Sequence, residues 1–142
     1  GYIIVVLASL ASQILLNDQS SISVIKVFVS IAVVIGHIYP VFYGFKGGKG
    51  VATTFGVLLA TSFVLGGLAS LVWVTTFLKT KISGFAAVST ALTLPLISFF
   101  IINMEYHQEF WLVFGLSFIL CMLLLFRHST NILELRRGFK KK

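Results

Sequence analysis

Long apolar segments separated by short polar connectors run along most of the chain, from Gly1 to Phe126. A helix needs roughly 20 mostly apolar residues to cross a bilayer, and several of these segments reach that length. The pattern therefore predicts an all-α, polytopic membrane protein with a single membrane domain over residues 1–142. We expect six membrane helices, at residues 1–16, 22–41, 51–65, 68–78, 82–102 and 110–126.

The apolar stretch 51–78 is too long for one ordinary crossing, and Gly66-Gly67 offers a point at which it can fold back on itself. Basic residues cluster in three segments, 46–50, 79–81 and 127–142, whereas connectors 17–21 and 103–109 carry acids and no Lys or Arg. Two short helices at 51–65 and 68–78 place every basic segment on one face, as the positive-inside rule requires. One long tilted helix at 51–78 remains the alternative, because glycine is common in membrane helices.

Composition supports the membrane assignment and adds a strong charge bias. The sequence is 58% hydrophobic and 11% charged, with a net charge of +7, whereas soluble domains carry about 25% charged residues. We interpret the basic segment 127–142 as a cytoplasmic C-terminal tail on anionic lipid and expect no nucleic-acid partner. The single Cys121 excludes a disulfide framework or cysteine metal cluster. The start, Gly-Tyr-Ile-Ile, lacks the basic region of a signal peptide, and we expect the chain to be truncated within a helix.

The segment Lys46-Gly47-Gly48-Lys49-Gly50-Val51-Ala52-Thr53 has the chemistry of a phosphate cradle. Its glycines allow several backbone N–H groups to converge on one oxyanion. The helix predicted from Val51 directs its positive N-terminal end to the same place, where Lys49 and Thr53 add further contacts. The segment does not match a nucleotide-binding P-loop, because Tyr43 and Gly50 stand where that pattern needs Gly and Ser or Thr. The alternative is an ordinary cytoplasmic turn.

Two further groups of polar residues lie at predicted helix ends. His37 precedes Pro40 at the end of one helix, and Arg127-His128-Ser129-Thr130-Asn131 follows the last one. Arg127 can fork to a phosphate, His128 can transfer a proton near pH 7, and Asn131 can orient a hydroxyl. A capped interfacial histidine and a membrane stop signal are the structural alternatives.

Predicted topology places both groups on the face that carries Lys49, which points to a phosphorylated substrate meeting a lipid. His107 with Glu105 and Glu109 could hold a metal, but we favour a solvated connector.

These segments resemble a known family. The sequence GHIYPVFYGFKGGKGVATTFG is similar to the second cytoplasmic motif of bacterial acyl-phosphate:glycerol-3-phosphate acyltransferases, and RHSTNILELRRG to their third motif. The resemblance spans essentially the whole chain. It implies transfer of an acyl group from acyl phosphate to the 1-hydroxyl of glycerol 3-phosphate, which yields lysophosphatidic acid and phosphate for phospholipid synthesis. It further implies seven helices in the bacterial inner membrane, with no metal or nucleotide cofactor.

The resemblance also implies roles for matching residues. His128 and His37 would be catalytic, and the substrate-binding residues would be Gly47, Gly48, Lys49, Gly50, Thr53, Arg127 and Asn131. The family's first motif, a Ser/Gly/Asn-rich loop with an arginine, has no counterpart and would precede Gly1. We therefore expect this chain by itself to be inactive or severely impaired. The competing interpretations are a small anion or organophosphate transporter and a non-catalytic membrane scaffold.

Overall fold

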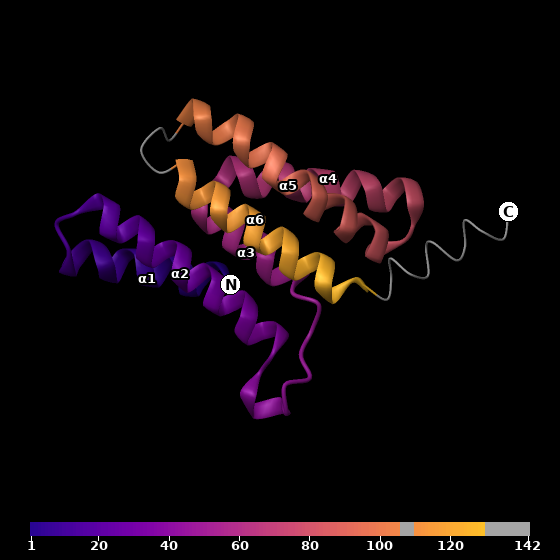
Figure 1. The fold of residues 1–142 in the computed structure, drawn as a ribbon, viewed down its shortest axis with the longest axis horizontal. Helices are drawn as coiled ribbons and strands as arrows, with labels where there is room; N and C mark the ends of the chain where they lie inside the picture. The colour runs from indigo at the N-terminus through magenta and orange to yellow at the C-terminus, as the bar shows by residue number, and fades with distance from the viewer. Residues whose placement is uncertain (106–109, 130–142) are drawn as a thin grey trace, which may run out of the picture.

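The structure is a computed structural model that describes residues 1–105 and 110–129, and this part of the chain forms α-helices with one short 3-10 turn (Figure 1). The elements are α1 (Tyr2–Leu15), α2 (Gln19–Ile38), η1 (Val41–Tyr43), α3 (Val51–Thr61), α4 (Phe63–Thr80), α5 (Ser83–Glu105) and α6 (Phe110–Arg127). The prediction of an all-α protein with six helices is confirmed for the described residues.

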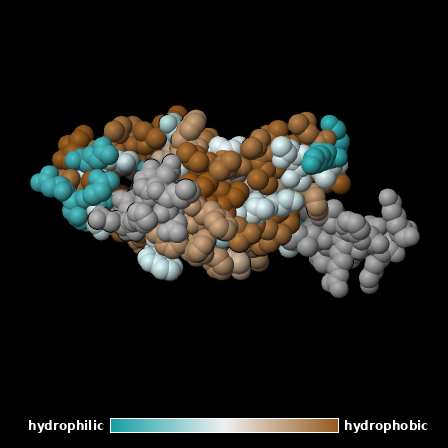
Figure 2. Space-filling model, turned by 90° about the horizontal axis from the view of Figure 1, so that it is seen from above, coloured by the Kyte–Doolittle hydropathy of each residue, from teal (hydrophilic) through white to brown (hydrophobic). Residues whose placement is uncertain are grey.

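Four helical segments are long and apolar enough to cross a membrane, namely Gln19–Tyr43, Phe63–Thr80, Ser83–Ile101 and Phe110–Arg127. The other two, α1 and α3, have 14 and 11 residues, which correspond to about 21 and 17 Å at 1.5 Å per residue. Figure 2 shows hydrophobic residues across the middle of the molecule and hydrophilic residues gathered at its two ends. This distribution fits a helical bundle that spans a bilayer.

The apolar stretch 51–78 folds back as a hairpin, but the predicted break at Gly66-Gly67 is wrong. The chain turns at Ser62, whose backbone is extended (φ −145°, ψ 120°) and whose hydroxyl accepts a hydrogen bond from the N–H of Leu65 at 3.2 Å. Ser62 thus ends α3 and caps the N-terminus of α4. Gly66 serves helix packing instead, since a Cβ there would lie 2.5 Å from the backbone N of Leu59. The single long helix is excluded.

Helix α2 also differs from its predicted range of 22–41. It begins at Gln19 because the Asp18 carboxylate accepts hydrogen bonds from the backbone N–H groups of Ser20 and Ser21, at 3.3 and 2.9 Å. It ends at Ile38, because Pro40 restricts the preceding residue to non-helical backbone. The 3-10 turn η1 begins at Val41, after Tyr39 and Pro40, so the connector that follows α2 starts earlier than predicted.

The α3–α4 hairpin brings three charged segments to the same end of the bundle. In Figure 1 the start of α3, the end of α4 and the end of α6 lie toward one end, while the α1–α2 turn and the start of α6 lie toward the other. Central α3 packs against α1, α2, α4 and α6. The buried core comprises Val5, Val34, Ile38, Val57, Leu58, Leu65, Ala69, Leu94, Val113, Leu116 and Leu120. This packing fixes the start of α3 between the ends of α2 and α6.

Candidate active site

The glycine loop, residues 47–50, lies against the C-terminal end of α2. A Cβ at Gly47 would clash with the carbonyl oxygen of His37 and come within 2.5 Å of the Pro40 ring. Gly50 has φ +82°, a left-handed conformation that favours glycine, and a Cβ there would meet Ile38 at 3.1 Å. Glycine is therefore required at both positions, by close approach at one and by backbone conformation at the other.

Arg127 ties this loop to the end of α6. Its Nη2 atom lies 3.3 Å from the carbonyl oxygens of both Gly47 and Gly48. Its guanidinium also lies over the ring of Tyr39, 5.5 Å from the ring centroid, in a cation–π arrangement. The same side chain thus contacts the loop and the end of α2, and it fixes their positions relative to α6.

His128 follows Arg127 and is 2% exposed. Its Nδ1 lies 2.8 Å from the carbonyl oxygen of Leu124. Because a carbonyl only accepts, Nδ1 carries the proton and Nε2 carries the lone pair. Burial lowers the pKa of His128, the hydrogen bond to Leu124 partly opposes this, and the positive charges of Lys49 and Arg127 lower it further. The imidazole is accordingly held neutral and is able to accept a proton at Nε2.

Two more predicted residues lie beside the same loop. The His37 ring is close to Gly48, since a Cβ on that glycine would be 2.6 Å from Nε2 of His37. Lys49 is exposed, and its charge acts on His128. The structure therefore gathers the glycine loop, His37, Lys49, Arg127 and His128 at one end of the bundle.

Thr53 lies in the first turn of α3, shortly after the glycine loop. Its methyl carbon Cγ2 would be 3.3 Å from a Cβ on Gly1, so it packs toward the start of α1. The neighbouring Thr54 is 2% exposed, and within the described part of the chain its hydroxyl has no hydrogen-bond partner. Asn131 lies outside the described residues, as does most of the basic tail 127–142.

Tyr39 is the contact that sequence reasoning missed. It is far from Arg127 in the chain, and an aromatic residue before Pro40 at a helix end gives no local sign of a cation–π partner. The connector with His107, for which we favour solvation over metal binding, cannot be compared either, since His107 and Glu109 lie outside the described ranges. Residues 1–105 and 110–129 contain no group of three potential metal ligands.

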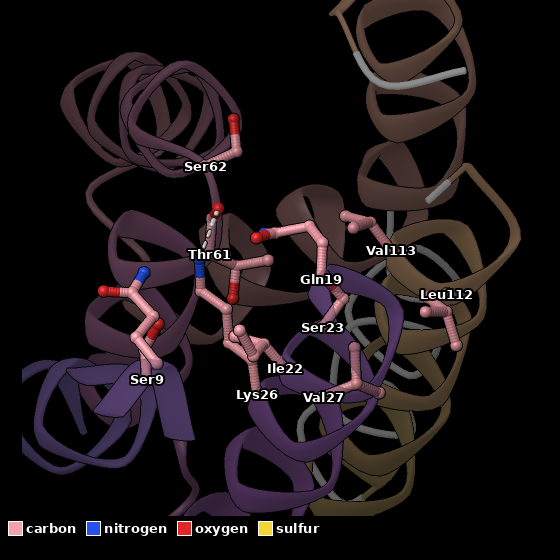
Figure 3. Close-up of a pocket in the computed structure, with 11 residues that line it drawn as sticks. Ser9, Gln19, Ile22, Ser23, Lys26, Val27, Thr61, Ser62, Leu112 and Val113 are labelled. Carbon is pink, nitrogen blue, oxygen red and sulfur yellow. Dashed lines mark hydrogen bonds between the residues drawn. The ribbon is translucent and has the colours of Figure 1, made fainter. Parts of the chain in front are cut away.

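A polar cavity of about 240 Å³ lies elsewhere, between α1, α2, the α3–α4 junction and α6 (Figure 3). Lys26 reaches across it and donates from Nζ to the carbonyl oxygen of Thr61 at 3.3 Å, shown as the dashed line in Figure 3. That carbonyl belongs to the last turn of α3, so Lys26 holds the hairpin turn against α2. The cavity contains none of the predicted site residues.

A family model described as glycerol-3-phosphate acyltransferase matches residues 1–138. The chain belongs to this family. Among curated relatives, a glycerol-3-phosphate acyltransferase of Methylobacillus flagellatus is 44% identical over 119 residues, which are 81% of this chain and 58% of that protein. One from Neisseria meningitidis serogroup C is 36% identical over 142 residues, 100% of this chain and 66% of that protein.

Solved structures give the same family. Crystal structures of PlsY (YgiH), an integral membrane glycerol 3-phosphate acyltransferase, match at 32% identity in a glycerol 3-phosphate form and a lysophosphatidic acid form. Their TM-scores are 0.74 and 0.75, with 92% of this chain covered and 60% and 62% of the PlsY chains. The chain thus spans about 58–66% of the length of these relatives.

Proposed function

We propose that the protein to which this chain belongs transfers an acyl group from acyl phosphate to the 1-hydroxyl of glycerol 3-phosphate. The products would be lysophosphatidic acid and inorganic phosphate. The observation that carries the proposal is the convergence of Lys49, Arg127 and a buried neutral His128 on one glycine loop at one end of a membrane bundle. Family membership supports the acceptor and the product, since the related PlsY structures are named for glycerol 3-phosphate and lysophosphatidic acid forms; acyl phosphate as the donor is part of the proposal.

The loop and Lys49 would bind phosphate. The start of α3 directs the positive end of its helix toward the loop, and Lys49 adds a full charge beside it. Arg127 already donates to two loop carbonyls, so it would chiefly hold the loop in a shape that presents N–H groups to the substrate. Asn131 would orient the acceptor.

The chemical step would need no enzyme nucleophile, because acyl phosphate carries its own leaving group. The acceptor hydroxyl oxygen forms a bond to the acyl carbon, the bond from that carbon to the phosphate oxygen breaks, and phosphate leaves with the electron pair. The hydroxyl proton passes to Nε2 of His128, to His37, or to the departing phosphate. His128 suits this role best, because its lowered pKa keeps it neutral near pH 7. No step uses a metal or nucleotide.

The arrangement also favours a multi-pass protein of the bacterial inner membrane, with the site and C-terminus in the cytoplasm. The hairpin turn at Ser62 places Lys49 and Lys79 toward the same end of the bundle as Arg127, which agrees with the positive-inside rule. A transporter is less well supported, since the polar cluster lies at one end of the bundle and not at its midplane.

An assay of the full-length protein reconstituted in lipid tests the proposal. Given acyl phosphate and glycerol 3-phosphate, it should release phosphate in step with lysophosphatidic acid, and Lys49→Ala should abolish both. Lys79→Ala is the matched control, because Lys79 is an exposed lysine in the last turn of α4. A folded protein without product, or equal loss in both variants, would sink the proposal.

A further inference from the structure

The turn that follows α2 displays large apolar side chains to the outside. Residues 41–45 hold four of them, and the exposed fractions are 68% for Val41, 98% for Phe42, 77% for Tyr43 and 61% for Phe45. Figure 1 shows this turn extending away from the body of the bundle. Such a cluster is unlike the scattered single hydrophobic residues of an ordinary protein surface, and it marks an interaction site.

Backbone hydrogen bonds fix the conformation in which these apolar side chains are exposed. The N–H of Phe45 donates to the carbonyl of Pro40 at 3.0 Å, and the N–H of Lys46 donates to that of Tyr43 at 3.3 Å. Gly44 and Phe45 both adopt left-handed backbone, with φ 59° and 60°. This conformation is uncommon for a bulky residue, and it persists only where the surroundings favour it.

Charge and position indicate what covers the turn. It ends the apolar segment Gln19–Tyr43, which is long enough to span a membrane, so it lies at the level where hydrocarbon gives way to headgroups. Lys46 and Lys49 follow it, and the sequence has no Asp or Glu between Gln19 and Met104. Aromatic residues beside lysine are the composition of a membrane interface, and a basic segment with no acid near it in the sequence complements anionic lipid.

We infer that this turn, Val41–Phe45, docks in the headgroup region of an anionic bilayer. It thereby holds the adjoining glycine loop at the membrane surface, where a lipid-soluble substrate arrives. The turn connects directly to Gly47 and Gly48, whose carbonyls Arg127 holds, so the two are placed together. The second half of the inference rests on the proposed function, whereas the docking itself does not.

Fluorescence tests the docking without any catalysis. Phe42→Trp is made in full-length protein in which every native tryptophan, Trp73 and Trp111 included, is replaced by phenylalanine, in vesicles of phosphatidylcholine and phosphatidylglycerol. Asn17→Trp in the same background is the matched control, because Asn17 is an exposed polar residue in the turn before α2.

The probe at position 42 should be quenched by lipids brominated near the headgroup and be shielded from aqueous acrylamide. The probe at position 17, in a polar turn, should be quenched more strongly by acrylamide than the probe at position 42. Acrylamide quenching at position 42 as strong as that of free tryptophan in water overturns the inference. Shielding at position 42 without quenching by the brominated lipids also overturns it. So does shielding that disappears when the protein is diluted in the vesicles, since another protein surface would then cover the turn.

Kinetics tests the link to the substrate. Phe42→Ser should raise the KM for acyl phosphate about tenfold, the effect of losing roughly half of a buried aromatic contact, and leave the KM for glycerol 3-phosphate unchanged. Equal changes in both KM values, or no change in either, would disprove the role of the turn in holding the glycine loop at the membrane surface. If the protein made no product at all, the proposed function would fail while the quenching result stood.

Discussion

Arg127 and Gly47 are joined by a hydrogen bond in which the guanidinium Nη2 lies 3.3 Å from the glycine carbonyl oxygen. The bond links the end of α6 to the loop that precedes α3, two parts of the chain that are distant in sequence. Since Arg127 reaches Gly48 in the same way and stacks over Tyr39, one side chain determines how three backbone segments meet. The loop's shape therefore depends on the planar guanidinium, which reaches both carbonyls through Nη2 while it lies over the Tyr39 ring, and not on positive charge alone.

Replacing Arg127 by lysine should separate these two contributions. Lysine keeps the charge but cannot bond both carbonyls while stacking on Tyr39, so we expect kcat to fall about 10- to 100-fold, the effect of losing hydrogen bonds to a charged group. Steady-state kinetics of Arg127→Lys and Arg127→Ala in lipid measures this. Near-normal turnover in Arg127→Lys would show that charge alone matters.

Gly47→Ala should inactivate the protein for a steric reason. The new methyl group would clash with the carbonyl oxygen of His37 and press on Pro40, so the loop must move away from α2. We expect at least a 100-fold loss of activity, because displacement of a substrate-positioning group by about 1 Å costs that much. Gly36→Ala, on the exposed side of α2 with no atom within 4 Å, should leave activity unchanged. Comparable loss in both variants would contradict the explanation.

The helical hairpin shows what the sequence could and could not predict. Charge placement required residues 51–78 to fold back, because one helix would have put Lys49 and Lys79 on opposite faces, and this prediction is confirmed. The position of the turn was wrong because Gly66-Gly67 is the more conspicuous break, whereas Ser62 acts through a capping bond that composition does not reveal. A glycine pair in a membrane helix indicates close packing as readily as a turn.

The candidate site shows a similar division. Motif chemistry and topology predicted that the glycine loop, His37, Lys49, Arg127 and His128 lie on one face. The structure places all of them at one end of the bundle. The contacts among them depend on tertiary packing. Neither the Arg127–Tyr39 stacking nor the packing of Thr53 toward Gly1 follows from spacing along the chain, because both join elements that meet only in the folded bundle.

Gly66→Val should destabilise the hairpin. Its Cβ would lie 2.5 Å from the backbone N of Leu59, so α3 and α4 must separate, at an overpacking cost of about 1–3 kcal/mol. Thermal unfolding in detergent, followed by circular dichroism, measures the change. The control is Gly67→Ala, which points into open space and removes a flexible residue from a helix, so its stability should be equal or slightly higher. Similar melting temperatures for Gly66→Val and the unmodified protein would disprove the close contact.

The pH dependence of His128 should reveal its surroundings. Burial and the charges of Lys49 and Arg127 disfavour the imidazolium, so its pKa lies below the ordinary histidine value. The neutral base is then present throughout the neutral range, and turnover should decline only at pH values below about 6.5.

NMR titration of labelled histidine should show that Lys49→Met raises the pKa of His128, because one repelling charge is gone, and that Lys79→Met leaves this pKa unchanged. If His128 takes the proton, His128→Gln should be severely slowed and lose this acid limb. Were the limb to persist in His128→Gln with substantial turnover, the departing phosphate would be the base.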